Sequence, residues 1–463
     1  MGKRNLANSA SGRQEKSPQR IFAAFAGIRV AFAFLLLLAA GGCRAQGPVG
    51  PRAIAGPPGP VPAEYFGMHV HRLLEGTAWP DVGFATLRLW DTGTTWKDLE
   101  PARGQYRFEK LDRLVALAAS RHVRILLTFG KTPDWASRFP EGGRFPRETG
   151  APSSMQDWSD FVGTVAARYK GRIEGYEIWN EPNWKGFYND TVEQMVEMTR
   201  VASRAIRKAD PGALVVSPSA TTNDGIPWLK QFLGMGGGEL VDVIAYHLYT
   251  TPAPPERIPE LASDVRAAMA AAHIDKPLWD TETSWTAPRQ FSNDEEQAAF
   301  AARTMVLGWA SGAVRLYWYA WDNRNWVTVN MTRNDNNHST PAAAAYDKVR
   351  NWMTGRRLEG CVVDANETWS CRLTAPGEES FIYWNPQRSA AFSPQSVIAT
   401  TPQSDSCVSR AGSGSSGIPA ATVFPQRVLF RVSDDVHLGA GKTMEIEKRM
   451  RLAKAPGKIE ATR

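Results

Sequence analysis

The sequence predicts a (β/α)8 barrel followed by a small antiparallel β domain. Short apolar runs alternate eight times with longer amphipathic stretches between residues 64 and 355. A doubly wound open sheet is disfavoured because no glycine-rich phosphate-binding turn follows the first run. From about Arg356 the pattern changes to short alternating runs without a long helix. A chain of 463 residues is long enough for one large and one small domain.

Eight segments have the signature of buried strands. They are rich in apolar, β-branched and aromatic residues, and they cover 64–70, 84–90, 123–130, 173–180, 213–219, 240–249, 276–283 and 313–321. Between them, apolar residues at helical spacing predict helices over 110–121, 191–209 and 294–310. Catalytic groups of such barrels lie at the carboxyl ends of the strands, so a functional site is expected there.

The predicted organisation has five parts. These are a signal peptide of lipoprotein type (1–43), a Pro/Gly-rich linker (44–63), the catalytic barrel (64–355), a β-rich accessory domain (356–441) and a basic tail (442–463). The leader is basic and then apolar over 30–42, too short to span a bilayer, which predicts export. Small residues precede Cys43, as in bacterial lipoproteins. The protein is thus expected in the periplasm, on the cell surface or outside the cell, and lipid on Cys43 would attach it to a membrane.

The formal charge of +7 does not indicate a nucleic-acid partner. Its positive part lies in the two ends, since residues 1–52 carry eight Lys/Arg against one Glu and residues 442–463 carry seven against three acids. The body between them is therefore slightly acidic. The oligomeric state is not indicated.

Cysteine usage suits an oxidising compartment. Cys361 and Cys371 have the spacing of a bridge across a β-hairpin, Cys407 is left over, and any pairing of the three is open. The sequence has no His/Cys cluster with metal-ligand spacing, so neither a metal nor another cofactor is expected.

Two carboxylates follow strand runs on opposite sides of the predicted barrel. Glu181 ends the fourth run in "GYEIWNEPNW", and Glu282 lies at the tip of the seventh in "WDTETSW". Glycoside hydrolysis needs such a pair, one to protonate the leaving oxygen and one to meet the anomeric carbon. We expect the close spacing of about 5–5.5 Å that gives retention. Environment should keep Glu181 protonated and Glu282 ionised near neutral pH.

Further side chains at strand ends are candidates for substrate contact. Arg88 and the Tyr249 hydroxyl are predicted partners of Glu282, and His247 shares a strand face with Tyr249. The remaining candidates are aromatic and polar residues of the mouth: Asn180, Trp318, Trp321, His69 and Trp135. Each has a structural alternative, such as core packing for a tryptophan or an internal ion pair for Arg88. Strand alternation does not choose between Trp318 and Trp321.

The motifs "YEIWNEPN", "TPDWAS" and "TETSW" resemble those of the (β/α)8 retaining glycosidases of clan A, most closely family 39. That family includes β-xylosidases, α-L-iduronidases and bacterial exopolysaccharide hydrolases, and the resemblance covers roughly residues 64–355. It implies that Glu181 is the acid/base, Glu282 the nucleophile and Asn180 the partner of the sugar 2-hydroxyl. Arg88, His247 and Tyr249 match the clan's supporting residues, and Trp318 or Trp321 its aromatic wall.

The leading hypothesis is an exported retaining hydrolase of a β-linked polysaccharide or oligosaccharide. An exo-acting, β-xylosidase-like enzyme is the nearest alternative. A non-catalytic carbohydrate-binding barrel is the alternative of another class, and it is disfavoured because both carboxylates are present. The long segment 131–156 could shape either an open cleft or a closed pocket, so the sugar, the linkage and endo or exo action stay open.

Overall fold

A computed structural model shows the fold of the chain. It describes residues 52–139, 141, 144–286, 291–323 and 326–387, and the backbone of three further strands at 390–392, 421–423 and 429–433. The expected leader with Cys43, the basic tail and Cys407 lie outside the described residues. Within the described residues no helix has the length and apolar character needed to cross a membrane.

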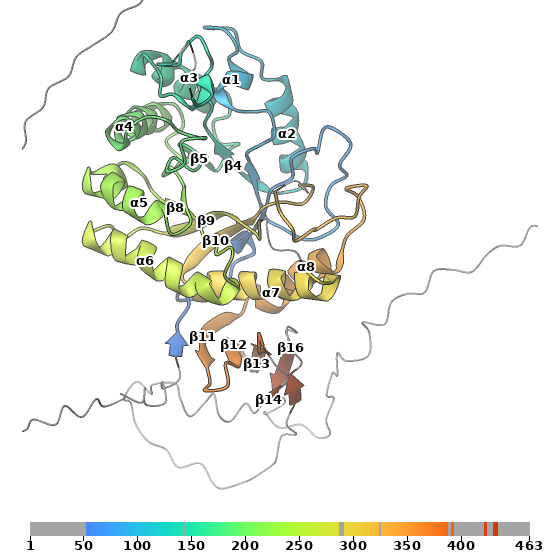
Figure 1. The fold of residues 1–463 in the computed structure, drawn as a ribbon. Coiled ribbons are helices and arrows are strands. Elements are labelled where there is room, and N and C mark those ends of the chain that lie inside the picture. The colour runs from blue at the N-terminus through green and yellow to red at the C-terminus, as the bar shows by residue number, and fades with distance from the viewer. Residues whose placement is uncertain are drawn as a thin grey trace, which may run out of the picture. The chain divides into compact units, whose positions relative to one another are not determined.

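The predicted barrel is confirmed as a set of parallel strands surrounded by helices (Figure 1). Its strands are β2 (Phe66–Met68), β3 (Thr86–Leu89), β4 (Arg124–Thr128), β5 (Gly175–Glu177), β6 (Leu214–Val216), β7 (Ala220–Thr221), β8 (Ile244–His247), β9 (Leu278–Thr283) and β10 (Ala313–Trp318). Their order in the sheet is β6-β5-β4-β3-β2-β10-β9-β8-β7, with every pairing parallel.

The fifth barrel strand is split into β6 and β7 around Pro218, which has no N–H to donate. β6 pairs with β5 and β7 pairs with β8. A parallel bridge also joins Val216 of β6 to Val243, the residue just before β8. The two ends of the strand order therefore meet, and eight chain segments close the barrel as predicted.

The helices lie between successive strands. They are α1 (Trp96–Leu99), α2 (Glu109–Ser120), α3 (Met155–Arg168), α4 (Val192–Ala209), α5 (Gly225–Gly234), α6 (Ile258–Ala271), α7 (Asp294–Ala310) and α8 (Pro341–Met353). The helices predicted at 110–121, 191–209 and 294–310 are α2, α4 and α7. The side chains of Ser154, Thr191, Asn293 and Thr340 accept hydrogen bonds from backbone N–H groups at the starts of α3, α4, α7 and α8.

Apolar clusters of different size fill the described part of the barrel domain. The largest one lies between strands and helices, and includes Trp158, Trp179 and Phe300. A smaller one fills the barrel interior and consists of Leu126, Val216, Val243, Ala245, Trp279 and Tyr317. Inward-facing positions beyond this inner core, toward the carboxyl ends of the strands, are polar. These polar positions form the site described below.

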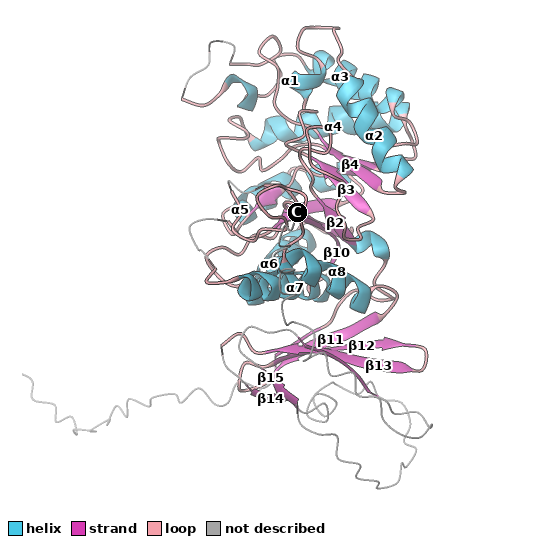
Figure 2. Ribbon diagram, turned by 90° about the vertical axis from the view of Figure 1, so that its right-hand side faces the viewer, coloured by secondary structure: helices cyan, strands magenta, loops and turns pink. Residues whose placement is uncertain are grey.

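The predicted C-terminal β domain is also present. Its sheet contains β11 (Arg357–Val363), β12 (Trp369–Ala375), β13 (Glu378–Trp384) and β16 (Leu429–Ser433), and β11 to β13 lie side by side in Figure 2. A separate two-stranded sheet pairs β14 (Ala390–Phe392) antiparallel with β15 (Ala421–Val423). Part of the expected linker differs from the prediction, because β1 (Arg52–Ile54) pairs antiparallel with β11 as the edge of this sheet.

A disulfide joins Cys361 and Cys371, which face each other on β11 and β12. This resolves one of the pairings that the sequence left open. Trp369 and Trp384 stack at 5.5 Å and are almost completely buried, so bracing describes them better than an exposed sugar platform. Trp384 Nε1 donates to Glu256, which also accepts from Arg303 of α7. The accessory sheet is thus tied to the barrel by polar contacts.

Candidate active site

Alternation along β8 places two polar side chains above the inner core. Ala245 belongs to that core, and His247 and Tyr249 follow at two-residue steps on the same face. His247 is completely buried and Tyr249 is nearly so. His247 contacts Glu181 and Tyr249 contacts Glu282, and only the second of these contacts was predicted from the sequence.

Arg88 of β3 is the centre of the polar interior. Its three nitrogens donate to three different side chains: Nε to Glu177 at 2.7 Å, Nη1 to Glu282 at 2.8 Å and Nη2 to Asn180 at 2.7 Å. The guanidinium is completely buried, so its charge must be balanced by these neighbours. The predicted contact between Arg88 and Glu282 is present, and Arg88 also fixes Asn180.

Glu177 of β5 is a buried carboxylate that the sequence analysis did not select. Besides Arg88, it accepts hydrogen bonds from the hydroxyls of Thr128 and Thr281, each at 2.7 Å. The sequence signal was a charged residue in the middle of an apolar strand, where only a paired charge is tolerated. Glu177 therefore holds Arg88 in the position from which Arg88 contacts Glu282.

Glu181 lies just past β5, where the chain turns into Pro182. Its backbone φ is +44°, a conformation that costs a non-glycine residue of the order of 1 kcal/mol. The backbone is held there because the Glu181 N–H donates to Ser219 O at 2.9 Å. The side chain then reaches His247, with 2.9 Å between Oε1 and Nδ1. These contacts therefore hold Glu181 in its strained backbone conformation.

A β-bulge in β9 directs Glu282 into the barrel. Leu316 of β10 pairs with Asp280, whereas Trp318 pairs with Thr283, so β9 has one extra residue between these pairs. Consequently the adjacent residues Thr281 and Glu282 both reach the inner network, one at Glu177 and the other at Arg88. Glu282 also accepts the Tyr249 hydroxyl at 3.0 Å. Arg88 and Tyr249 are therefore both contacts of Glu282, as predicted.

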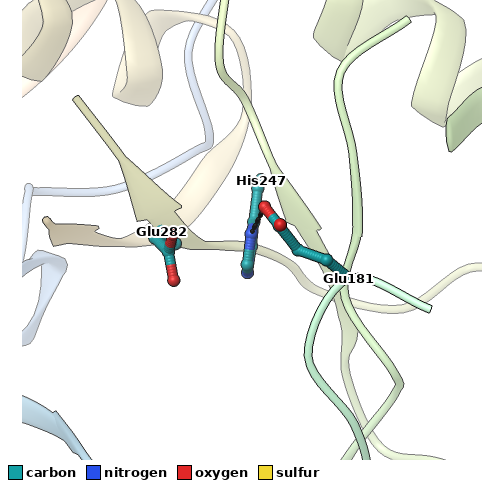
Figure 3. Close-up of side chains that lie close together, drawn as sticks. All are labelled: Glu181, His247 and Glu282. Atoms are coloured by element: carbon teal, nitrogen blue, oxygen red, sulfur yellow. Dashed lines mark hydrogen bonds and ion pairs between the residues drawn. The ribbon is translucent and has the colours of Figure 1, made fainter. Parts of the chain in front are cut away.

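The two glutamates approach each other across His247 (Figure 3). One carboxylate oxygen of Glu181, one of Glu282 and one ring nitrogen of His247 all lie within 4.8 Å of one another. Burial raises the pKa of Glu181 to about 7 and that of Glu282 to about 7. Burial lowers the pKa of His247 to about 4, so the imidazole is neutral near pH 7.

These pKa values differ from the expectation that environment alone separates the two carboxyls. Their hydrogen bonds distinguish them instead. Glu282 accepts from a cation and a phenol, which favour its ionised form. Glu181 lies against the neutral imidazole of His247, with which it can share a proton, and has no cation bonded to it among the described residues. A single proton between the two glutamates is therefore best placed on Glu181.

The same trio has donor atoms close enough for a metal ion. The chemistry of the surroundings argues against such a role. The Arg88 guanidinium already occupies one oxygen of Glu282 and places a positive charge beside the trio. A divalent cation would have to replace that contact or sit against it. The trio fits acid–base chemistry on an organic substrate better than metal binding.

The aromatic residues at the eighth strand differ from the prediction. Tyr317 belongs to the inner core, so alternation turns Trp318 outward, where it meets Phe300 of α7. Trp321 is buried in the large core. Among the described residues, no hydrogen bond or ring contact joins the side chain of either tryptophan to the residues around Glu181 and Glu282. Tyr319, which the sequence analysis missed, lies at the mouth and donates to Asp91 at 2.7 Å.

His69 and Trp135 occupy different surroundings. His69 is completely buried, with Nε2 3.0 Å from Thr281 O and its ring against Tyr319 at 5.1 Å. It lies beside the site but has no described hydrogen bond to either glutamate. Trp135 contacts Trp96, and its Nε1 donates to the carbonyl of Glu100. The structure therefore does not bring Trp135 to the candidate site.

Comparisons with known proteins identify the family. The family model described as glycosyl hydrolases family 39 matches residues 72–318. A β-xylosidase of Geobacillus stearothermophilus is 25% identical over 238 residues, covering 44% of this chain and 46% of that protein. A β-xylosidase of Caldicellulosiruptor saccharolyticus is 30% identical over 180 residues, covering 34% and 36%. The chain thus spans less than half the length of these two relatives.

A solved structure shares the fold. A family 39 glycoside hydrolase from the gut symbiont Bacteroides cellulosilyticus superposes with a TM-score of 0.59 and 18% sequence identity. The match covers 72% of this chain and 73% of that one. At this identity the likeness supports the fold alone.

Proposed function

The chain belongs to glycosyl hydrolase family 39, and from this premise we propose that it is a glycoside hydrolase that cleaves β-linked oligosaccharides or polysaccharides with retention of configuration. Xylose-containing chains are the first substrates to test, because two relatives are named β-xylosidases. The observation that carries the proposal is the pair of buried glutamates whose oxygens lie within 4.8 Å of each other.

Glu282 is the nucleophile in this proposal. Its ionised form is supported by Arg88 and Tyr249, and these contacts also fix its direction. The carboxylate attacks the anomeric carbon, the glycosidic bond breaks, and a glycosyl ester forms on Glu282. A short separation suits this route because inverting enzymes leave room for a water between carboxyls about 6.5–9.5 Å apart.

Glu181 is the acid/base. Its raised pKa keeps a proton available near pH 7, and it gives that proton to the leaving oxygen. The resulting carboxylate then takes a proton from the water that hydrolyses the ester, which releases the sugar and restores both groups. His247 contacts Glu181 throughout and is suited to orient it. We assign to Asn180, which Arg88 holds, the role of partner of a sugar hydroxyl.

Release of reducing ends from a panel of β-linked plant and bacterial polysaccharides tests the activity. Wild type is compared with the Glu181→Gln/Glu282→Gln double variant, and product sizes separate endo from exo cleavage. Glu282→Ala should abolish turnover. Glu181→Ala should lose roughly 10²–10⁴-fold on poor leaving groups and much less on 4-nitrophenyl glycosides. Near-normal hydrolysis by Glu282→Ala would refute the assignment.

Stereochemistry provides a separate test of the retaining mechanism. Proton NMR of the first product from a β-glycoside should show the β anomer before mutarotation. An initial α anomer would mean inversion and would contradict the nucleophilic role of Glu282. The control is the double variant, which should give neither anomer.

Export remains part of the proposal. The basic and then apolar leader before Cys43 supports it. Cell fractionation with mass spectrometry of the mature N-terminus tests it, and a cytoplasmic protein that keeps residues 1–42 would contradict it.

A further inference from the structure

An exposed tryptophan lies on the turn that follows the proposed proton donor. Among the described residues, the exposed large apolar side chains are Phe139, Trp184, Met235 and Trp326. A single exposed apolar side chain is ordinary on a protein surface. Trp184 differs because its turn begins at Glu181, and three residues of chain span at most about 11 Å.

The turn that carries Trp184 is firmly held. The Trp184 N–H donates to the carbonyl of Glu181 at 3.0 Å. Asn183 makes two hydrogen bonds with the backbone of Thr221, donating at 3.3 Å and accepting at 3.0 Å. The backbone of Trp184 is therefore fixed relative to the candidate active site by contacts that do not involve its ring.

The indole is seated on other aromatic rings. Trp184 and Phe187 stack with 6.4 Å between centroids and 23° between planes, and Phe187 meets Trp90 at 6.2 Å. Trp90 packs in one cluster with Tyr319, the residue at the mouth. An aromatic series thus leads from the mouth to the surface.

The outer member, Trp184, is the most exposed ring of the series. Trp90 is 3% exposed, and the Lys131 ammonium lies 5.2 Å above its ring. Trp184 is 47% exposed although Phe187 covers one of its faces. A rigid indole with one free face is suited to stacking against the C–H face of a sugar ring.

We propose that Trp184, supported by Phe187, is a subsite for a sugar ring beyond the one whose bond is broken, so that the enzyme is adapted to chains rather than to single glycosides. The inference rests on the proposed function. Its ligand is a further unit of the same β-linked substrate, because the aromatic series is continuous with the mouth and the turn begins at the proton donor.

Chain-length dependence tests the subsite. The measured quantity is kcat/KM for xylohexaose divided by kcat/KM for 4-nitrophenyl β-D-xyloside. Trp184→Ala should lower this ratio about tenfold, the factor expected for losing one stacked ring. Trp184→Phe should restore part of it. A ratio within about twofold of wild type in Trp184→Ala would overturn the subsite.

Trp79→Ala is a matched control. Trp79 also stacks on a phenylalanine, Phe84, at 5.2 Å and 19°, but Phe84 precedes the amino end of β3, at the opposite end of the barrel. Its substitution should leave the ratio unchanged. A fall equal to that of Trp184→Ala would mean that loss of any surface indole acts through general structure, and would also overturn the proposal.

Calorimetric binding separates failure of the subsite from failure of the proposed activity. Xylohexaose is titrated into the Glu181→Gln/Glu282→Gln variant with and without Trp184→Ala. If wild type hydrolyses no β-xyloside but binding weakens about tenfold with Trp184→Ala, the activity is wrong and the subsite is supported. Equal affinities, or binding by neither protein, would overturn the subsite.

Discussion

Replacing Tyr249 with phenylalanine should reduce activity on the acid side of the pH profile, so that the enzyme is active over a narrower pH range. The Tyr249 hydroxyl donates to Glu282 at 3.0 Å and is held in a buried position. A hydrogen bond to a charged group contributes about 1.5–3 kcal/mol. Since one pKa unit corresponds to about 1.36 kcal/mol, losing this bond should raise the pKa of Glu282 by roughly one to two units.

The direction follows from which form of Glu282 the hydroxyl favours. It stabilises the carboxylate, so its removal favours the protonated and non-nucleophilic form. Near pH 7 the acid limb of kcat/KM should therefore move to higher pH, and activity at pH 6 should fall by about tenfold or more. Because the two glutamates titrate as a pair, the quantity to compare is the lower of the two apparent pKa values.

The assay is kcat/KM on a 4-nitrophenyl glycoside between pH 5 and pH 10. Tyr246→Phe is the control, because Tyr246 points the opposite way on β8 and donates to the backbone of Thr222. Its acid limb should stay in place. An acid limb of Tyr249→Phe that is unmoved, or that moves to lower pH, would refute the role assigned to the hydroxyl.

Three further outcomes follow from the same contacts. Arg88→Met leaves buried carboxylates without their cation and should cost about 3–5 kcal/mol in urea unfolding; a loss below about 1 kcal/mol would contradict the buried network. Replacing Cys361 and Cys371 with serine should lower unfolding stability by about 2–3 kcal/mol without changing kcat/KM, which denaturation and kinetics can check together. Glu181 and Glu282 have folded pKa values above their unfolded ones, so the folded state binds more protons between about pH 4.5 and 7 and stability should fall as pH rises through that window. The Glu181→Gln/Glu282→Gln variant should not show this fall of up to about 3 kcal/mol per group, and an unchanged pH dependence would contradict the raised pKa values.

The sequence was sufficient for the barrel because eight buried strands alternate with amphipathic helices, a pattern that tertiary packing reinforces. It was also sufficient for the polar side chains that alternate cleanly with the inner core, such as Arg88, His247 and Tyr249. The split of the fifth strand was readable in principle from Pro218, although the sequence analysis treated that strand as continuous.

The features that the sequence analysis missed depend on contacts between segments that are distant in the chain. Side chains alternate along a strand, and Tyr317 joins the inner core. Tyr319 therefore faces inward and Trp318 faces outward. The bulge that directs Glu282 inward arises from pairing between β9 and β10, which a single strand sequence does not encode. Glu177 was missed because its partner Arg88 is distant in the chain.

The pairing of β1 with β11 changes how the two domains should be regarded. The first described strand belongs to the sheet that the chain completes last, so the barrel is an insertion within the accessory domain rather than a neighbour that precedes it. During synthesis, β1 must wait for the whole barrel to be made before its partner exists. Proteolysis after Gly355 would not release the sheet intact. Deleting residues 52–54 would expose the edge of β11, where a second molecule could add a strand.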